Sequence, residues 1–188
     1  MARRSLTKDT TAVRQRLDGH AIVLVGLMGA GKTTVGRILA ATWGVGFRDT
    51  DQDVEAAEGR SISDIFVDSG EAEFRALERT AVASALAEHD GVLAVGGGAV
   101  LDESTRERLA GHRVVFLRVG LSDAAQRVGL GVSRPLLLGN VRGRIKQLID
   151  ERTPVYESVA THVVDTDGLA VGEVVERVRA AVEDASHG

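Results

Sequence analysis

The chain has 188 residues and a mass of 19.9 kDa, the size of one domain. A composition of 44% hydrophobic and 27% charged residues, with a mean hydropathy of +0.01, excludes collagen-like, disordered and coiled-coil chains. A net charge of −4 and 3% aromatic residues argue against nucleic-acid binding, and no apolar run has the roughly 18 residues of a membrane span. The chain has no cysteine, which excludes disulfides and thiolate chemistry. We therefore expect a cytoplasmic enzyme without nucleic-acid or membrane partners.

The first 19 residues are polar and basic and contain no apolar stretch of the kind found in a secretory signal. They predict a flexible N-terminal tail, because termini without apolar anchors are usually mobile. An organelle transit peptide is the alternative, which Asp9 and Asp18 disfavour.

From His20 onward, short apolar runs alternate with helical patterns. The apolar runs predict buried strands over 21–25, 46–48, 92–95, 114–117 and 162–165. Helices are expected over 32–42, 53–59, 61–68, 71–88, 102–110, 122–129, 141–151 and 171–184. Ser61 and Asp64 form a predicted capping pair, Ser122 is a predicted N-cap, and Pro154 is expected just beyond a helix end.

This alternation predicts a single three-layer α/β/α domain over residues 20–185, with five parallel strands and helices on both faces. Ligands bind such sheets beyond the carboxyl ends of the strands. The chemistry is therefore expected in the segments that directly follow strands.

The segment GLMGAGKT at 26–33 matches the phosphate-binding loop G-x-x-x-x-G-K-[ST], and it lies between a predicted strand and a predicted helix. Its glycines let successive backbone N–H groups face a phosphate, and the helix N-terminus adds a favourable dipole. Lys32 is expected to reach the β- and γ-phosphates, and the Thr33 hydroxyl to bind Mg²⁺. The motif predicts binding of a nucleoside triphosphate.

Two further strand ends carry candidate residues. Asp49 and Asp51 either cap the next helix or, facing the phosphate loop, hold a magnesium-bound water and accept a bond from an attacking hydroxyl. Three glycines at 96–98 are either a flexible turn or a place where a ligand approaches the backbone closely.

Arginines supply the remaining candidates. Arg75 stands at i,i+4 from Glu71, so on residues alone it is a surface ion pair, and Arg152 is an ordinary helix-end cation. Arg134 lies in a glycine-bounded segment at about 129–140, which predicts a mobile lid whose arginine stabilises γ-phosphate charge. Trp43, Tyr156 and the phenylalanines are expected to pack rather than to stack on a ligand.

The ordered set GLMGAGKTT, DTD, GEAEFR, GGGAV, RPLL and ERTPVYE closely resembles the shikimate kinase family over residues 20–180. The resemblance implies a P-loop fold like that of nucleoside monophosphate kinases, with a five-stranded parallel sheet and a lid. It also implies ATP- and Mg²⁺-dependent phosphorylation of the shikimate 3-hydroxyl, giving shikimate 3-phosphate and ADP on the way to chorismate. Family members are commonly monomers.

Carried onto this chain, the resemblance implies an ATP site made of Gly29, Ala30, Gly31, Lys32, Thr33, Thr34, Arg127 and Arg134. Thr33 would bind the metal, and Asp49 would do so through water. The substrate would contact Asp51, Arg75, Gly97, Gly98 and Arg152, and Arg75 and Arg152 would bind its carboxylate. The implied catalytic residues are Asp51, Lys32 and Arg134.

The chain departs from the family at three places: Met28 in the loop, threonine in place of serine at 33, and no cation in the segment at 167–169 near the expected adenine site. A gluconate kinase on the same fold is the nearest alternative, although it needs fewer carboxylate clamps. A nucleoside monophosphate kinase would need a base pocket, which the sequence does not show. A non-catalytic nucleotide-binding module usually lacks part of the set Lys32, Thr33, Asp49 and Asp51, and a GTPase would carry N-K-x-D.

Overall fold

The computed structural model describes residues 20–129 and 140–184. Within them, the strands are β1 Ile22–Val25, β2 Phe47–Asp49, β3 Val92–Ala94, β4 Arg113–Arg118 and β5 His162–Asp165. The α-helices are α2 Lys32–Trp43, α3 Thr50–Glu58, α4 Ile62–Glu88, α5 Glu103–Leu109, α6 Leu121–Gly129, α7 Val141–Val159 and α8 Val171–Asp184, and a 3₁₀ turn spans Ala99–Leu101. The expected tail at 1–19, most of the expected lid and Arg134 lie outside the described residues.

The five strands form one parallel sheet, as the sequence predicted, and their order in it is β2-β3-β1-β4-β5. The central strand β1 pairs with β3 on one side and with β4 on the other, so the chain reverses its winding direction next to β1. In an open α/β sheet this switch point is where a crevice forms at the carboxyl ends of the strands. The glycine-rich loop after β1 lies there.

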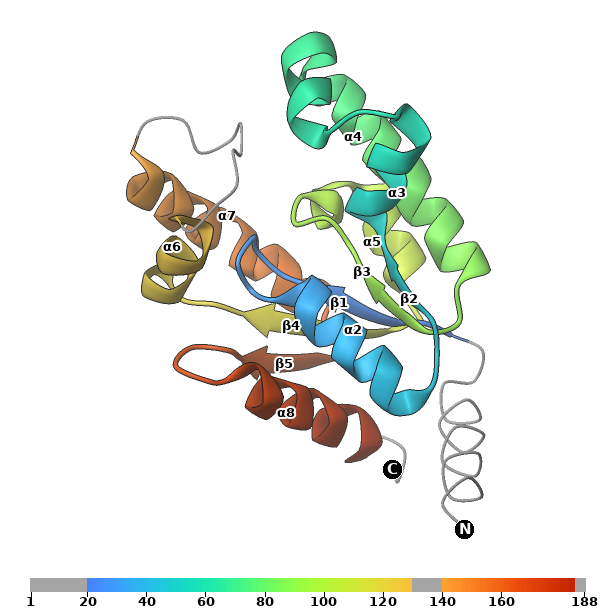
Figure 1. The fold of residues 1–188 in the computed structure, drawn as a ribbon, viewed down its shortest axis with the longest axis vertical. Coiled ribbons are helices and arrows are strands. Elements are labelled where there is room, and N and C mark those ends of the chain that lie inside the picture. Colours follow the sequence, from blue (N-terminus) through green and yellow to red (C-terminus); the bar gives the residue numbers. More distant parts are fainter. Residues whose placement is uncertain (1–19, 130–139, 185–188) are drawn as a thin grey trace.

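Two apolar layers cover the sheet, and β1 contributes alternate side chains to each. Ile22 and Leu24 pack with residues of α2, α6, α8 and the first half of α7. Val23 and Val25 pack with residues of α4, α5 and the second half of α7. All four side chains are fully buried, which explains why β1 is a continuous apolar run rather than an alternating one. Figure 1 shows α2 and α8 side by side on one face of the sheet.

A third, smaller apolar cluster joins α3 to α4 around Val54, Ile65 and Phe74. In Figure 1 the first part of α4 extends beyond the sheet, above β2 and β3. This lobe forms one wall of the candidate site.

Helix α4 covers the two helices expected at 61–68 and 71–88 and includes a break at Gly70, where φ is 83° and ψ is 172°. Such a conformation is essentially restricted to glycine, which explains why the helical pattern changes there. The capping pair is confirmed, because the Ser61 hydroxyl accepts a bond from the Asp64 N–H at 3.1 Å.

Two expectations about helix ends were wrong. The helix expected to end at 151 continues to Val159 with Pro154 inside it, and Val155 and Tyr156 beyond the proline pack into the core. That burial offsets the backbone hydrogen bond that a proline cannot donate. Ser122 is not an N-cap, because α6 already begins at Leu121 and the Ala124 N–H donates to the Gly120 carbonyl.

None of the helices that the structure describes is both long enough and apolar enough to span a bilayer.

Candidate active site

The phosphate-binding loop is held in shape by its own glycines and by Lys32. Gly29 and Gly31 have φ values of 81° and 92°, in the left-handed region that other residues seldom adopt. The Lys32 ammonium donates to the carbonyls of Gly26 at 2.8 Å and Leu27 at 3.1 Å. These bonds place the charge across the mouth of the loop, where a polyphosphate would meet both the ammonium and the start of α2.

Asp49 caps a helix and also contacts the phosphate-binding loop. One of its carboxylate oxygens caps α3 by accepting a bond from the Asp51 N–H at 3.1 Å. The other accepts a bond from the Thr33 hydroxyl at 2.8 Å. Cap and loop are therefore joined through a carboxylate that is 8% exposed.

The donor set at this point fits Mg²⁺. Hydroxyl and carboxylate oxygens are the ligands that this hard cation prefers, and it usually takes only one or two protein groups beside substrate phosphates and water. The described residues contain no cluster of three or more acidic, histidine or cysteine side chains that would suggest another kind of metal site. Thr33 and Asp49 are the residues that would hold the ion.

Arg75 lies on α4, at the opposite wall from the phosphate loop. Its guanidinium donates to Glu78 at 2.6 Å and to Glu71 at 3.1 Å, so the expected i,i+4 ion pair is present and a second acidic partner was not anticipated. Glu78 is 3% exposed, and this burial raises the pKa of its carboxyl above the ordinary value, against the opposing effect of Arg75 and with a further rise caused by Asp51. The ion pair with Glu78 fixes the Arg75 guanidinium at the cavity wall.

The three glycines at 96–98 make room for these charged groups. A Cβ on Gly96 would lie 2.4 Å from a Glu78 carboxylate oxygen and 2.6 Å from an Asp51 carboxylate oxygen. A Cβ on Gly98 would lie 2.0 Å from an Arg75 guanidinium nitrogen. The bare backbone at Gly96 and Gly98 therefore lets these side chains approach the end of β3.

Arg152 enters the same region from α7. Its side chain is buried, with 6% of the residue exposed, and one guanidinium nitrogen donates to the Gly97 carbonyl at 3.2 Å. The Tyr156 hydroxyl donates to the same carbonyl. The second half of α7, which the sequence did not predict as helix, is what presents both groups.

Arg127 on α6 joins the phosphate loop to the segment after β5. Its guanidinium donates to the Gly29 carbonyl at 3.2 Å, to the Thr166 carbonyl at 3.1 Å and to Asp123 at 3.0 Å. Asp167, in the segment that carries no cation of its own, accepts bonds from the Gly120 N–H. Arg127 therefore provides the cation at this end of the site.

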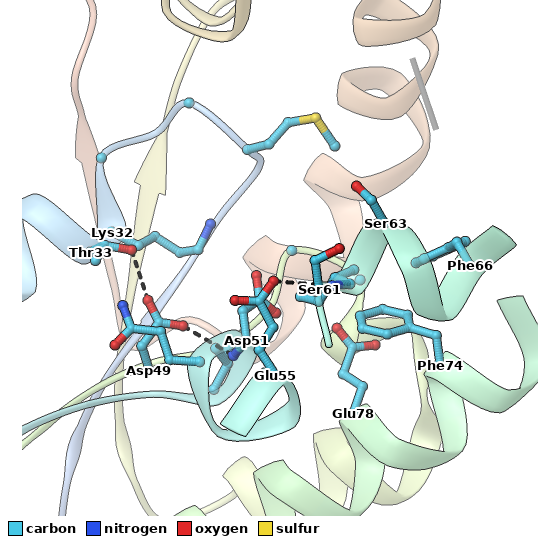
Figure 2. Close-up of a pocket in the computed structure, with 18 of the residues that line it drawn as sticks. Lys32, Thr33, Asp49, Asp51, Glu55, Ser61, Ser63, Phe66, Phe74 and Glu78 are labelled. Atoms are coloured by element: carbon cyan, nitrogen blue, oxygen red, sulfur yellow. Dashed lines mark hydrogen bonds between the residues drawn. The ribbon is translucent and has the colours of Figure 1, made fainter. Parts of the chain in front are cut away.

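These groups line one cavity of about 590 Å³. Figure 2 shows it with Lys32, Thr33 and Asp49 on one side, Asp51 between, and Phe66, Phe74 and Glu78 on the other. The cavity also meets Gly29, Gly31, Thr34, Arg75, Gly97, Gly98, Arg127 and Arg152. Ala30, which was also expected at the ATP site, does not line the cavity, because its side chain is buried in an apolar layer.

Sequence reasoning missed four residues that contribute to the site. Glu78 was not singled out, although its i+3 spacing from Arg75 was a usable signal. Tyr156 was assigned to packing; it is buried against Phe116, and it also hydrogen-bonds the glycine segment. Phe66 and Phe74, with ring centroids 4.7 Å apart, give the cavity an apolar wall that only the folding of α4 brings together.

A parallel sheet whose central strand runs into a phosphate loop, beside a magnesium-type oxygen pair and an acceptor cavity, defines a P-loop phosphotransferase. The family model described as shikimate kinase matches residues 28–183. The chain is 59% identical over 161 residues to the shikimate kinase of Frankia casuarinae, covering 86% of this chain and 72% of that one. It is 57% identical over 156 residues to that of Thermobifida fusca, covering 83% and 91%.

Comparison with solved structures identifies the same family. Shikimate kinase from Acinetobacter baumannii in complex with shikimate superposes with a TM-score of 0.89 at 32% identity, covering 95% of this chain and 99% of that one. A gluconokinase from Sinorhizobium meliloti reaches a TM-score of 0.55 at 21% identity, covering 89% and 94%, which shows a shared fold alone.

The chain belongs to the shikimate kinase family. Its activity is the ATP-dependent phosphorylation of shikimate, with ATP as co-substrate and Mg²⁺ as the usual metal of the family.

Proposed function

We propose that the reaction takes place inside the cavity of about 590 Å³, with ATP phosphates at Lys32 and Thr33 and shikimate between Asp51, Arg75 and Arg152. The observation that carries this assignment is that the phosphate loop and the arginine pair line one continuous space. Phosphoryl transfer needs the two reacting oxygens held in line, and a shared cavity supplies that arrangement.

At the nucleotide end, the backbone of the loop, from Gly29 to Thr34, and the Lys32 ammonium hold the β- and γ-phosphates. Thr33 and Asp49 would hold Mg²⁺, and the ion would supply neutralisation of phosphate charge when bound. Arg127 is the residue for the base, and its hydrogen bonds to the carbonyls of Gly29 and Thr166, which join the phosphate loop to the segment after β5, support this role.

At the acceptor end, Asp51 orients the 3-hydroxyl and takes its proton as that oxygen bonds to the γ-phosphorus and the bond to ADP breaks. A weak base is sufficient, because the transition state of phosphoryl transfer is loose and the proton leaves late. Asp51 lines the cavity between the phosphate loop and Glu78, the position that this role requires.

Arg75 and Arg152 bind the shikimate carboxylate. Two guanidinium groups can each bind a carboxylate through a fork of N–H donors, a geometry that lysine does not offer. Both line the cavity, and Gly97 and Gly98 beside them add backbone contacts to the substrate.

Arg134 lies outside the described residues, and its proposed role is to stabilise the transferring phosphate from the segment at about 129–140. The sequence RPLL at 134–137 supports that role. We further propose that the chain acts as a monomer, because one chain supplies the phosphate loop, Asp51 and both arginines. A cysteine-free composition favours the reducing cytoplasm as its compartment.

ADP release from Mg-ATP, measured with shikimate, with gluconate and with no acceptor, tests the assignment of the cavity. We expect stimulation by shikimate alone, and we expect Asp51→Asn to lose most of that stimulation while ATP binding remains. An Asp51→Asn variant with the full rate would remove Asp51 from the mechanism. Stimulation by gluconate would mean that the arginine pair does not select the acceptor.

A further inference from the structure

The hydroxyl of Tyr156 makes a contact that packing does not require. Tyr156 is 1% exposed, and its ring packs against Phe116 of β4 with centroids 4.9 Å apart. The hydroxyl leaves this apolar layer and donates to the carbonyl of Gly97, in the segment that lines the cavity. Tyr156 thus connects the core beneath the sheet to the part of the cavity wall formed by Arg75, Gly97, Gly98 and Arg152, which is called the acceptor wall below.

The carbonyls of the two neighbouring glycines accept hydrogen bonds from backbone N–H groups, whereas the Gly97 carbonyl accepts them from side chains. The Gly96 carbonyl accepts a bond from the Ala99 N–H, and the Gly98 carbonyl accepts one from the Leu101 N–H, each at 3.0 Å. Both bonds belong to the local turn. The Gly97 carbonyl is instead held by two side chains of α7, Arg152 and Tyr156, which stand one helical turn apart.

Holding this carbonyl has a consequence for the next peptide group. The Gly97 carbonyl and the Gly98 N–H belong to one planar trans peptide, so they point in opposite directions. Glycines have no side chain to restrict the rotation of that plane. A donor that fixes the carbonyl toward α7 therefore also fixes the N–H away from it.

The same carbonyl also positions Arg152. Its guanidinium donates to Gly97 through Nη1 at 3.2 Å, and it additionally interacts with the Tyr156 hydroxyl. Because the Gly97 carbonyl and the Tyr156 hydroxyl both contact the Arg152 guanidinium, they hold it in one orientation at the cavity wall. Burial raises the pKa of Tyr156 to about 12, so the hydroxyl keeps its proton and stays a donor.

We propose that Tyr156 is a positioning residue for shikimate: its hydroxyl, by holding the Gly97 carbonyl, orients the Gly97–Gly98 peptide and the Arg152 guanidinium toward the acceptor. The proposal rests on the proposed function, in which Gly97, Gly98 and Arg152 contact shikimate. Tyr156 itself acts through them and takes no part in the chemical step.

Steady-state kinetics of Tyr156→Phe, with each substrate varied in turn, test the proposal. The variant keeps the ring and removes the hydroxyl, and we expect the KM for shikimate to rise about fivefold to tenfold, the usual effect of one lost hydrogen bond. The KM for ATP is expected to stay within about twofold, because Tyr156 makes no described contact with the phosphate loop. A KM for shikimate that stays within about twofold of the parent overturns the proposal, as does an equal rise for ATP.

Phe116→Leu is the matched control. It removes the ring against which Tyr156 packs and leaves the hydroxyl in place. It should lower the Tm while leaving the KM for shikimate near that of the parent. A rise in the KM of this control as large as that of Tyr156→Phe would show that packing, not the hydroxyl, governs the effect.

Arg152→Lys separates a failure of this proposal from a failure of the proposed function. If Arg152→Lys leaves shikimate binding unchanged, then the carboxylate clamp is wrong. If it weakens binding and Tyr156→Phe does not, then only the positioning role is wrong. In the double variant the two effects should be less than additive, because both residues share one carbonyl.

A second measurement avoids any folding defect of Tyr156→Phe. Tyr156 is the only tyrosine of the chain, so growth on 3-fluorotyrosine labels this position and retains the hydroxyl. We expect its fluorine resonance to shift as shikimate saturates the enzyme and to respond little to ATP alone. A resonance that shikimate leaves unchanged would overturn the proposal.

Discussion

At the scale of single residues, the acceptor wall depends on backbone that carries no side chain. Arg75 lies so close to Gly98 that a Cβ there would meet its guanidinium at 2.0 Å, and a Cβ on Gly96 would meet Glu78 at 2.4 Å and Asp51 at 2.6 Å. Gly98 itself has φ of −98° and ψ of −11°, which any residue can adopt. The need for glycine at 98 is therefore steric and concerns the Arg75 side chain rather than the turn.

This makes Gly98→Ala a substitution that should affect binding more than stability. The flexible end of Arg75 can move away from the new methyl group, but it then leaves its place at the cavity. We expect the KM for shikimate to rise by about tenfold or more, as for loss of one charge-assisted contact, with a small change in Tm. Gly172→Ala is the control, because nothing lies within 4 Å of a Cβ at that position. A large fall in Tm with unchanged kinetics would contradict the steric explanation.

Replacing Arg75 tests the carboxylate clamp directly. Arg75→Lys keeps the charge and the ion pairs with Glu71 and Glu78 within reach, but it replaces a planar fork by a point charge. We expect weaker binding of shikimate by about tenfold or more and little change for ATP, measured by titration with each ligand. Equal losses for the two ligands would show that Arg75 acts on the shape of the site and not on the carboxylate.

At the scale of elements, the sequence predicted the parts that follow from periodicity and missed those that depend on tertiary packing. Five apolar runs gave the five strands, and the loop motif gave the phosphate site, because both signals are local. Helix α7 was predicted to end at residue 151, before Pro154, because no local signal shows that Tyr156 will be buried against β4. Glu78 was missed for a similar reason, because its burial arises only when α4 packs beside the glycines that follow β3.

The break in α4 is a feature of this scale that can be tested. Gly70 adopts φ 83° and ψ 172°, and nothing lies within 4 Å of a Cβ there, so the cost of a side chain would come from the backbone alone. Gly70→Ala should lower the free energy of unfolding by about 1–3 kcal/mol, measured by urea denaturation. Gly172→Ala, in an ordinary helical conformation, should be neutral or slightly stabilising. An unchanged or raised stability of Gly70→Ala would mean that α4 tolerates a straight path through this position.

At the scale of the whole molecule, the two ends of the sheet have different chemistry. The carboxyl ends of the strands carry the active site, while four histidines gather at the amino ends: His20 before β1, His89 before β3, His112 before β4 and His162 at the start of β5. The rings of His20 and His112 are in edge contact, with centroids 5.2 Å apart. Protonation at this end should therefore affect stability without reaching the cavity.

The pKa values of two of these histidines set the sign of the effect. Burial lowers the pKa of His112, with a further reduction from His20, and burial together with Arg113 lowers the pKa of His162. The unfolded chain then binds protons at a higher pH than the folded chain does, so unfolding takes up protons. Stability is thus fully present above the ordinary histidine pKa and is lost as the pH falls through the lowered values in the fold.

Urea denaturation at about pH 8 and about pH 5.5 measures this loss of stability. These two pH values lie on either side of the ordinary histidine pKa and above the pKa of most carboxyl groups. We expect a lower free energy of unfolding at the acidic value and a smaller difference in the double variant His112→Gln and His162→Gln. Glu78, whose pKa burial raises, acts with the opposite sign, because its folded form binds a proton more readily. Glu78→Gln should therefore steepen the loss of stability on acidification, whereas a parent protein whose stability rises as the pH falls would show that Glu78 outweighs the two histidines.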